Sequence, residues 1–146
     1  MSQRVENAVA RFLSGSNCAQ AILHAFRDDG KLSEDLALKI ATGFGGGMGR
    51  KQEVCGAVTG GILVLGLHHG RGTAEGVEAA ERTYAATAEL MDRFAARHGS
   101  CLCRKLLEGY DISTEAGRLQ ARSDDVRNTI CKHCIQTVAE ILEDMK

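Results

Sequence analysis

The chain contains no proline, few aromatic residues and no large excess of charge of either sign. Its 18 basic and 19 acidic residues give a formal net charge of −1, which argues against binding to nucleic acid or to an anionic membrane surface. Proline is the residue that most strongly interrupts helices, so its absence leaves long helices unhindered. The composition therefore favours a helical protein whose partners are neither nucleic acids nor membranes.

Long hydrophobic runs are also missing. The longest stretch without a charged residue, Val54 to Gly70, contains five glycines and two histidines, and its apolar part is shorter than the roughly 20 residues that a membrane span needs. We expect no membrane span and interpret this stretch as a buried central helix. The N-terminal segment has charges throughout and lacks the apolar region of a secretory signal peptide, which predicts a cytoplasmic protein.

The apolar residues recur at helical spacing along almost the whole chain, which predicts an all-α fold. A length of 146 residues with 44% hydrophobic content suits one domain, residues 1–146, built as a compact bundle of about six to seven helices around the buried Gly-rich central helix. We expect the polar stretch from Tyr110 to Asp125 to be a connection that leads to the last helix. The expected helices lie near residues 5–13, 18–26, 34–40, 53–69, 74–97, 101–107 and 131–145.

Six cysteines are the most informative feature of the composition. Cytosolic thiols are normally kept reduced, so these residues are not expected to form static disulfides. Metal binding or thiol redox chemistry then becomes the leading interpretation. Free cysteines also serve as small buried hydrophobic residues, which leaves a purely structural role open for each one.

Four of the cysteines are predicted to lie in the first turn of a helix, namely Cys18, Cys55, Cys101 and Cys103. The unpaired N–H groups and the dipole at a helix N-terminus favour a thiolate and lower the pKa of a thiol. The neighbouring carboxylate of Glu53 is expected to oppose this effect at Cys55.

The sequence Cys131-Lys132-His133-Cys134 is a CxxC motif that we place inside the last helix rather than at its start. Residues three apart share one helix face, so the two sulfurs could meet or share a ligand. Together with the CxC of Cys101 and Cys103, they could supply four thiolates to zinc or to an iron–sulfur cluster. This ligand set is the alternative to a redox centre.

The segment Gly43 to Lys51 is rich in glycine. Such a loop can present backbone N–H groups to an anion, here with the support of two basic residues at its end. It matches neither of the established phosphate-binding motifs in register. The other interpretation is a turn of permissive residues that joins two helices.

The order of these motifs resembles the redox-active protein family labelled C-GCAxxG-C-C. The likeness rests on Asn17-Cys18-Ala19-Gln20, on the glycine loop followed by Cys55-Gly56-Ala57-Val58-Thr59-Gly60, on Cys103-Arg104-Lys105-Leu106-Leu107, and on Cys131 before Val138-Ala139-Glu140-Ile141-Leu142. The resemblance covers nearly the whole chain. It implies a helical protein with four signature cysteines, which correspond here to Cys18, Cys55, Cys103 and Cys131, while Cys101 and Cys134 look like additions.

Three hypotheses follow for the function. In the first, paired cysteines carry out thiol–disulfide exchange or electron transfer, with Cys18, Cys55, Cys103 and Cys131 as the catalytic set and either Cys18–Cys55 or Cys103–Cys131 as neighbours. In the second, the thiolates bind iron–sulfur or zinc. In the third, the chain is a structural helical module. The expected partner is a redox protein or a small thiol, and a homodimer is left open.

Overall fold

The computed structural model describes residues 1–145 and is all-helical apart from loops and one isolated β-bridge. Its α-helices are α1 (Gln3–Leu13), α2 (Cys18–Phe26), α3 (Glu34–Ala41), α4 (Gly56–His69), α5 (Val77–His98), α6 (Cys103–Leu106), α7 (Glu115–Ser123) and α8 (Lys132–Asp144). Short 3₁₀ turns cover Arg27–Gly30 and Thr42–Phe44, and a π-helical turn, Arg127–Cys131, leads directly into α8. The all-α prediction is confirmed.

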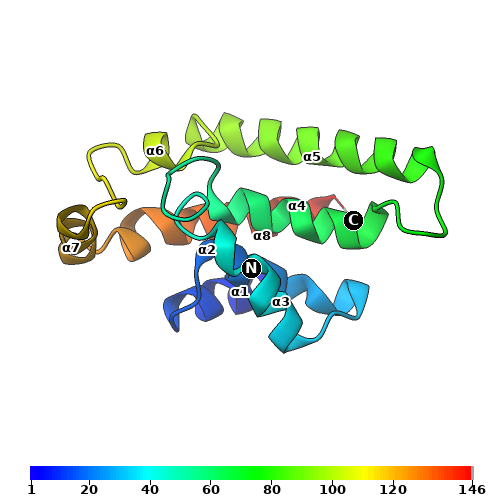
Figure 1. Ribbon diagram of the computed structural model, residues 1–146, viewed down its shortest axis with the longest axis horizontal. Coiled ribbons are helices and arrows are strands. Elements are labelled where there is room, and N and C mark those ends of the chain that lie inside the picture. The colour runs from blue at the N-terminus through cyan, green and yellow to red at the C-terminus, as the bar shows by residue number, and fades with distance from the viewer. Residues whose placement is uncertain (146) are drawn as a thin grey trace.

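Helix α4 lies in the middle of the molecule, with α5 on one side and α1, α2 and α3 on the other (Figure 1). It packs against α2, α5 and α8. Its first six residues are all buried, and its apolar side chains point in every direction rather than along one stripe. A helix that is hydrophobic all round must be covered on all sides, which explains its central position.

Glycines on α4 allow its neighbours to approach its backbone. A Cβ added to Gly60 would lie 2.9 Å from the carbonyl oxygen of Ala19 on α2, and one added to Gly56 would lie 3.0 Å from the Cβ of Cys18. On another side of α4, a Cβ on Gly61 would lie 2.8 Å from Leu90 on α5. Helix α2 therefore rests directly on α4 and brings Cys18 beside the start of α4.

The predicted helices are present, and one further helix was missed. Residues Glu115–Ser123 form α7 within the stretch that we expected to be a connection. Thr114 caps this helix by accepting a hydrogen bond from the N–H of Gly117. Only Ala121 on α7 is buried and Leu119 is 53% exposed, so the helix lacks the apolar periodicity by which it could have been recognised.

A second, small hydrophobic cluster lies at the end of the molecule where α6 and α7 are found (Figure 1). Its buried members are Cys103, Leu107, Ala121 and Val126. The cluster is linked to the main core through Cys131, which packs against both. Helices α6 and α7 therefore cover one end of the bundle and leave a boundary between the two clusters.

Within residues 1–145, every helix is too short or too polar to span a lipid bilayer.

The close contact of α2 with α4 predicts that replacing Gly60 with Ala destabilises the protein. The added methyl group would be too close to the Ala19 backbone, and we expect a net loss of roughly 1–2 kcal/mol in the free energy of unfolding. Gly66→Ala in the same helix is the matched control, because no atom lies within 4 Å of its added Cβ. Urea denaturation checks both, and equal stability of the two variants would contradict the proposed close packing.

Candidate thiol redox site

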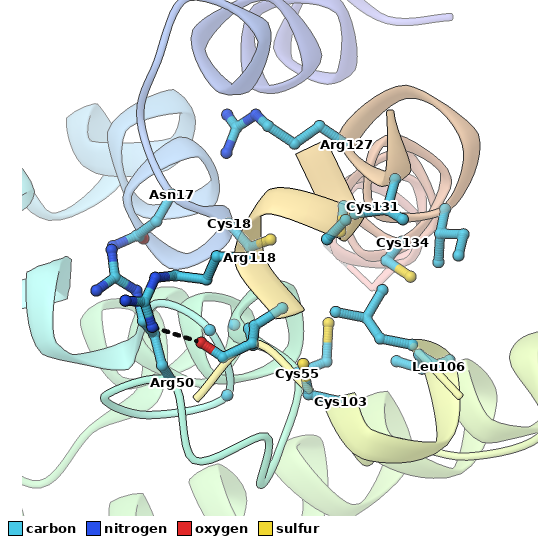
Figure 2. A pocket seen from close by; sticks show the side chains of 18 of the residues that line it. Asn17, Cys18, Arg50, Cys55, Cys103, Leu106, Arg118, Arg127, Cys131 and Cys134 are labelled. Carbon is cyan, nitrogen blue, oxygen red and sulfur yellow. Dashed lines mark hydrogen bonds between the residues drawn. The ribbon is translucent and has the colours of Figure 1, made fainter. Parts of the chain in front are cut away.

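Five of the six cysteines line one cavity of about 320 Å³, which we call the thiol pocket. It lies at the boundary between the two hydrophobic clusters and is formed by the start of α2, the glycine loop, the start of α4, helices α6 and α7, and the π turn. Figure 2 shows the five side chains inside it. They are Cys18, Cys55, Cys103, Cys131 and Cys134. All four cysteines of the predicted catalytic set are thus brought together.

Local structure fixes the first two of these cysteines at helix starts. Cys18 is the first residue of α2, and Asn17 and Gln20 form a reciprocal capping box before it. Cys55 is the N-cap residue of α4. The expectation that both lie at the beginning of a helix is confirmed.

Cys103 is brought to the pocket by backbone pairing between the segment before α4 and the segment before α6. Val54 and Leu102 form an antiparallel bridge, the N–H of Cys55 donates to the carbonyl of Cys101 at 2.8 Å, and the N–H of Cys103 donates to that of Glu53 at 2.6 Å. Cys103 is therefore the first residue of α6 and faces the cavity. No local pattern predicts this pairing, because the two segments are far apart in the chain.

The glycine loop is held in a tight turn by its own backbone hydrogen bonds. The N–H groups of Met48, Gly49 and Arg50 donate to carbonyls of the same loop. Gly47 has a φ of 69°, and a Cβ there would lie 2.8 Å from the Cβ of Cys103. The loop thus forms a tight turn that approaches the cysteines, and both of our interpretations of it stay predictions.

The pocket thiols form two neighbouring pairs, and all six cysteines are free. Cys18 interacts most strongly with Cys131, and Cys55 with Cys134, since each partner is the main influence on the pKa of the other. These pairs differ from both pairs that we expected. The two residues of the CxxC motif do not pair with each other, since each has a partner at the start of a different helix.

Within the pair Cys55–Cys134, the thiolate is favoured at Cys55. The hydrogen bond from Cys134 is the main cause that lowers the pKa of Cys55, and the N–H groups of Ala57 and Val58 at the start of α4 contribute further. The same interaction and burial raise the pKa of Cys134. Glu53 does not act as expected on Cys55, because its carboxylate forms an ion pair with Arg104 at 2.6 Å.

Within the pair Cys18–Cys131, the thiolate is favoured at Cys131. Its pKa is lowered chiefly by the hydrogen bond from Cys18 and also by the positive charge of Arg127. That hydrogen bond, together with burial, raises the pKa of Cys18. The expectation that the start of α2 lowers the pKa of Cys18 is therefore wrong, because the Cys18 thiol serves as the donor to its partner.

The remaining two cysteines are poor thiolates. Burial is the main cause that raises the pKa of Cys103 to about 12 and the pKa of Cys101 above its ordinary value. The Cys101 thiol donates to the carbonyl of Met91 and lies outside the thiol pocket. Of the four cysteines expected to be activated by a helix start, only Cys55 has a lowered pKa.

The four cysteines named as a ligand set for zinc or an iron–sulfur cluster are not brought together as one set. Cys101 faces α5, whereas Cys103, Cys131 and Cys134 face the pocket. Among residues 1–145, no group of three or more histidines, cysteines, aspartates or glutamates is arranged to hold a metal ion.

Two features of the site were missed from sequence. Cys134 was assigned a site role only in the ligand set, although it is the main influence on the pKa of Cys55, as Cys18 is on the pKa of Cys131. The buried side chain of Gln52 was also overlooked, and it connects the glycine loop to the segment before α7 by hydrogen bonds to Tyr110 and Ile112. The CxxC motif marked Cys134 but not its partner, and Gln52 carries no local pattern, since both roles depend on distant segments.

The pKa directions predict that a small neutral alkylating reagent modifies Cys131 well before Cys103 at neutral pH. Cys131 is half-buried with a lowered pKa, so its thiolate fraction is larger at pH 7 than that of Cys103, whose pKa is about 12. Peptide mapping after timed exposure to iodoacetamide measures both rates. Arg127→Gln should slow the alkylation of Cys131 by up to about fivefold, which is the effect expected from the loss of one exposed charge pair. Arg82→Gln on α5 is the control, and equal rates at Cys131 and Cys103 would contradict the assignment.

Comparison with known proteins gives one match. Residues 16–145 match the model of the family described as "Putative redox-active protein (C_GCAxxG_C_C)". No curated protein and no solved structure matches the chain. The matched region contains all six cysteines and every element that lines the thiol pocket except α1. The chain therefore belongs to this C-GCAxxG-C-C family.

Proposed function

We propose that the protein is a thiol–disulfide redox protein in which Cys131 is the attacking thiolate and Cys18 is its resolving partner. One observation carries this proposal: a single cavity contains two thiol pairs, and in each pair one pKa is lowered and the other is raised. A lowered pKa supplies the nucleophile, and a neighbouring thiol supplies the second sulfur that completes a disulfide. Membership of a redox-active family supports the same conclusion.

Cys131 is the better entry point for a substrate. It is half-buried, whereas Cys55 and Cys134 are only 6% and 2% exposed. The positive charge of Arg127 favours its thiolate without occupying the sulfur. A disulfide entering the pocket would therefore meet Cys131 before it meets the second pair.

The exchange is balanced in atoms and electrons. The Cys131 thiolate attacks one sulfur of a substrate disulfide, forms a mixed disulfide and releases one substrate thiolate. Cys18 then attacks the Cys131 sulfur, its proton passes to the second substrate sulfur as that group leaves, and a Cys18–Cys131 disulfide forms. Two cysteines are oxidised and the substrate disulfide is reduced to two thiols.

The second pair, Cys55 and Cys134, can return the first pair, Cys18 and Cys131, to its reduced state. Cys134 lies one helical turn after Cys131, so its thiol can attack the Cys131 sulfur and release Cys18 as its proton passes to the departing Cys18 sulfur. Cys55 then attacks Cys134, a Cys55–Cys134 disulfide forms, and Cys131 returns to its thiolate. The two pairs together would hold four electrons for transfer to a small disulfide or to a partner protein.

This scheme predicts how many thiols are lost. Mild oxidation with excess hydroxyethyl disulfide should reduce the free thiol count from six to two, because the two pairs use four of the six cysteines. The two that remain should be Cys101 and Cys103. Thiol titration followed by peptide mapping checks this result, and loss of all six thiols, or of none, would contradict the pairing.

The roles within the first pair are tested by two variants. Cys18→Ser combined with Cys134→Ser removes both thiols that can attack the Cys131 sulfur and should stop the exchange at the mixed disulfide, which intact-mass spectrometry detects as the added half of hydroxyethyl disulfide on Cys131. Cys131→Ser should slow the first step at least tenfold. Cys101→Ser is the matched control because its thiol lies outside the pocket. A Cys131→Ser protein that reacts as fast as this control would refute the proposal. Metal analysis is a separate test, since stoichiometric zinc, iron or sulfide in anaerobically purified protein would favour the metal-binding alternative.

A further inference from the structure

The thiol pocket is lined by four arginines as well as by cysteines. They are Arg50, Arg118, Arg122 and Arg127. The lining contains one carboxylate, Asp125, so the ionisable side chains other than cysteine carry four positive charges against one negative charge. The chain as a whole has a net charge of −1, so this positive charge is local to the pocket.

None of these four arginines forms an ion pair with a carboxylate within residues 1–145. Nearby Arg104, which does not line the pocket, is paired with Glu53. The carboxylate of Asp125 accepts from the side chain of Asn128 at 3.1 Å. Within residues 1–145, none of the four guanidinium groups is therefore neutralised by a direct ion pair with a carboxylate.

Two of the arginines are held in place by neutral groups. Arg118 donates to the carbonyl of Ile112 at 3.0 Å, and Arg127 donates to the carbonyls of Phe12 and Ser16 and lies over the Phe12 ring. Backbone carbonyls orient a guanidinium without cancelling its charge. Such arginines remain able to bind an anion through their other N–H groups.

Stabilisation of a cysteine thiolate accounts for only one of the four pocket arginines. Arg127 contributes to the lowered pKa of Cys131, but Arg50, Arg118 and Arg122 contribute to the lowered pKa of neither Cys131 nor Cys55. In Figure 2, Arg50 and Arg118 lie on one side of the cysteines and Arg127 lies on another. What the four arginines share is that all of them line the same cavity.

From this arrangement we infer that the thiol pocket binds a small anionic substrate, a disulfide or thiol that carries carboxylates at both ends. Its carboxylates would contact the arginines, which suit carboxylate geometry, and its sulfur would reach Cys131. A volume of about 320 Å³ accommodates a small molecule rather than a protein segment. This inference rests on the proposed function and names the chemical class of its substrate.

Equilibrium binding tests the anion site without any redox step. Suberate has the length and charges of dithiodipropionate but no disulfide, and octanediol is its neutral counterpart. We expect calorimetry of the intact protein to detect suberate binding that weakens with added salt, and no binding of octanediol. Arg50→Gln combined with Arg122→Gln should weaken suberate binding at least tenfold, while Arg82→Gln on α5 should leave it unchanged. Equal binding of octanediol, or an unaffected double variant, would overturn the inference.

Exchange kinetics test whether the same site selects the substrate. The protein thiols should be oxidised fastest by anionic dithiodipropionate, more slowly by neutral hydroxyethyl disulfide and slowest by cationic cystamine, after each rate is divided by the rate of the same disulfide with 3-mercaptopropanol, a neutral thiol. The double arginine variant should lose at least tenfold with dithiodipropionate and react normally with hydroxyethyl disulfide, which also shows that it is folded.

The two experiments separate the two claims. If hydroxyethyl disulfide oxidises the paired thiols but suberate does not bind, the anionic substrate is wrong and the redox function stands. If suberate binds at the arginines but no disulfide reacts, the redox function is wrong and the anion site stands.

Discussion

The approach of α2 to the backbone of α4 is the constraint on which the thiol pocket depends. Side chains at Gly56 and Gly60 would occupy the space now filled by Cys18, Ala19 and their neighbours. Because these two glycines have no side chains, Cys18 lies beside Gly56 at the N-terminus of α4, and Gly56 directly follows Cys55 in the chain. The C-terminal helical segment then needs only to run past this junction for its CxxC motif to meet a thiol from each of the two helices.

The position of the pocket between two hydrophobic clusters explains how buried sulfurs can remain reachable. Cys55 and Cys134 belong to the main core, while Cys103 belongs to the small cluster under α6 and α7. A boundary between clusters is less continuous than the interior of either one. The buried side chain of Gln52 connects the glycine loop to the segment before α7 and so holds the cover over the cavity. Its hydrogen bonds satisfy polar atoms that would otherwise be costly to bury.

Much of this structure could be predicted from local patterns. Cys18 and Cys55 were expected at helix starts because capping residues and the end of a glycine loop mark those positions. Helix α7 was missed because its residues are mostly exposed and give no apolar stripe. Cys134 was omitted from the catalytic set because a residue in the interior of a periodic helix does not reveal what lies opposite it. The resemblance to the family supplied the redox expectation but not the pairing.

The sequence by itself determined the helices, the number of thiols and their positions near helix ends, since each follows from interactions between residues a few positions apart. Tertiary structure decided which thiols are partners and therefore which pKa falls and which rises. It also decided that arginines from the glycine loop, α7 and the π turn surround one cavity. Hydrogen bonds and electrostatic interactions depend on distance in space, and for these residues that distance is set by how the helices pack rather than by their separation along the chain.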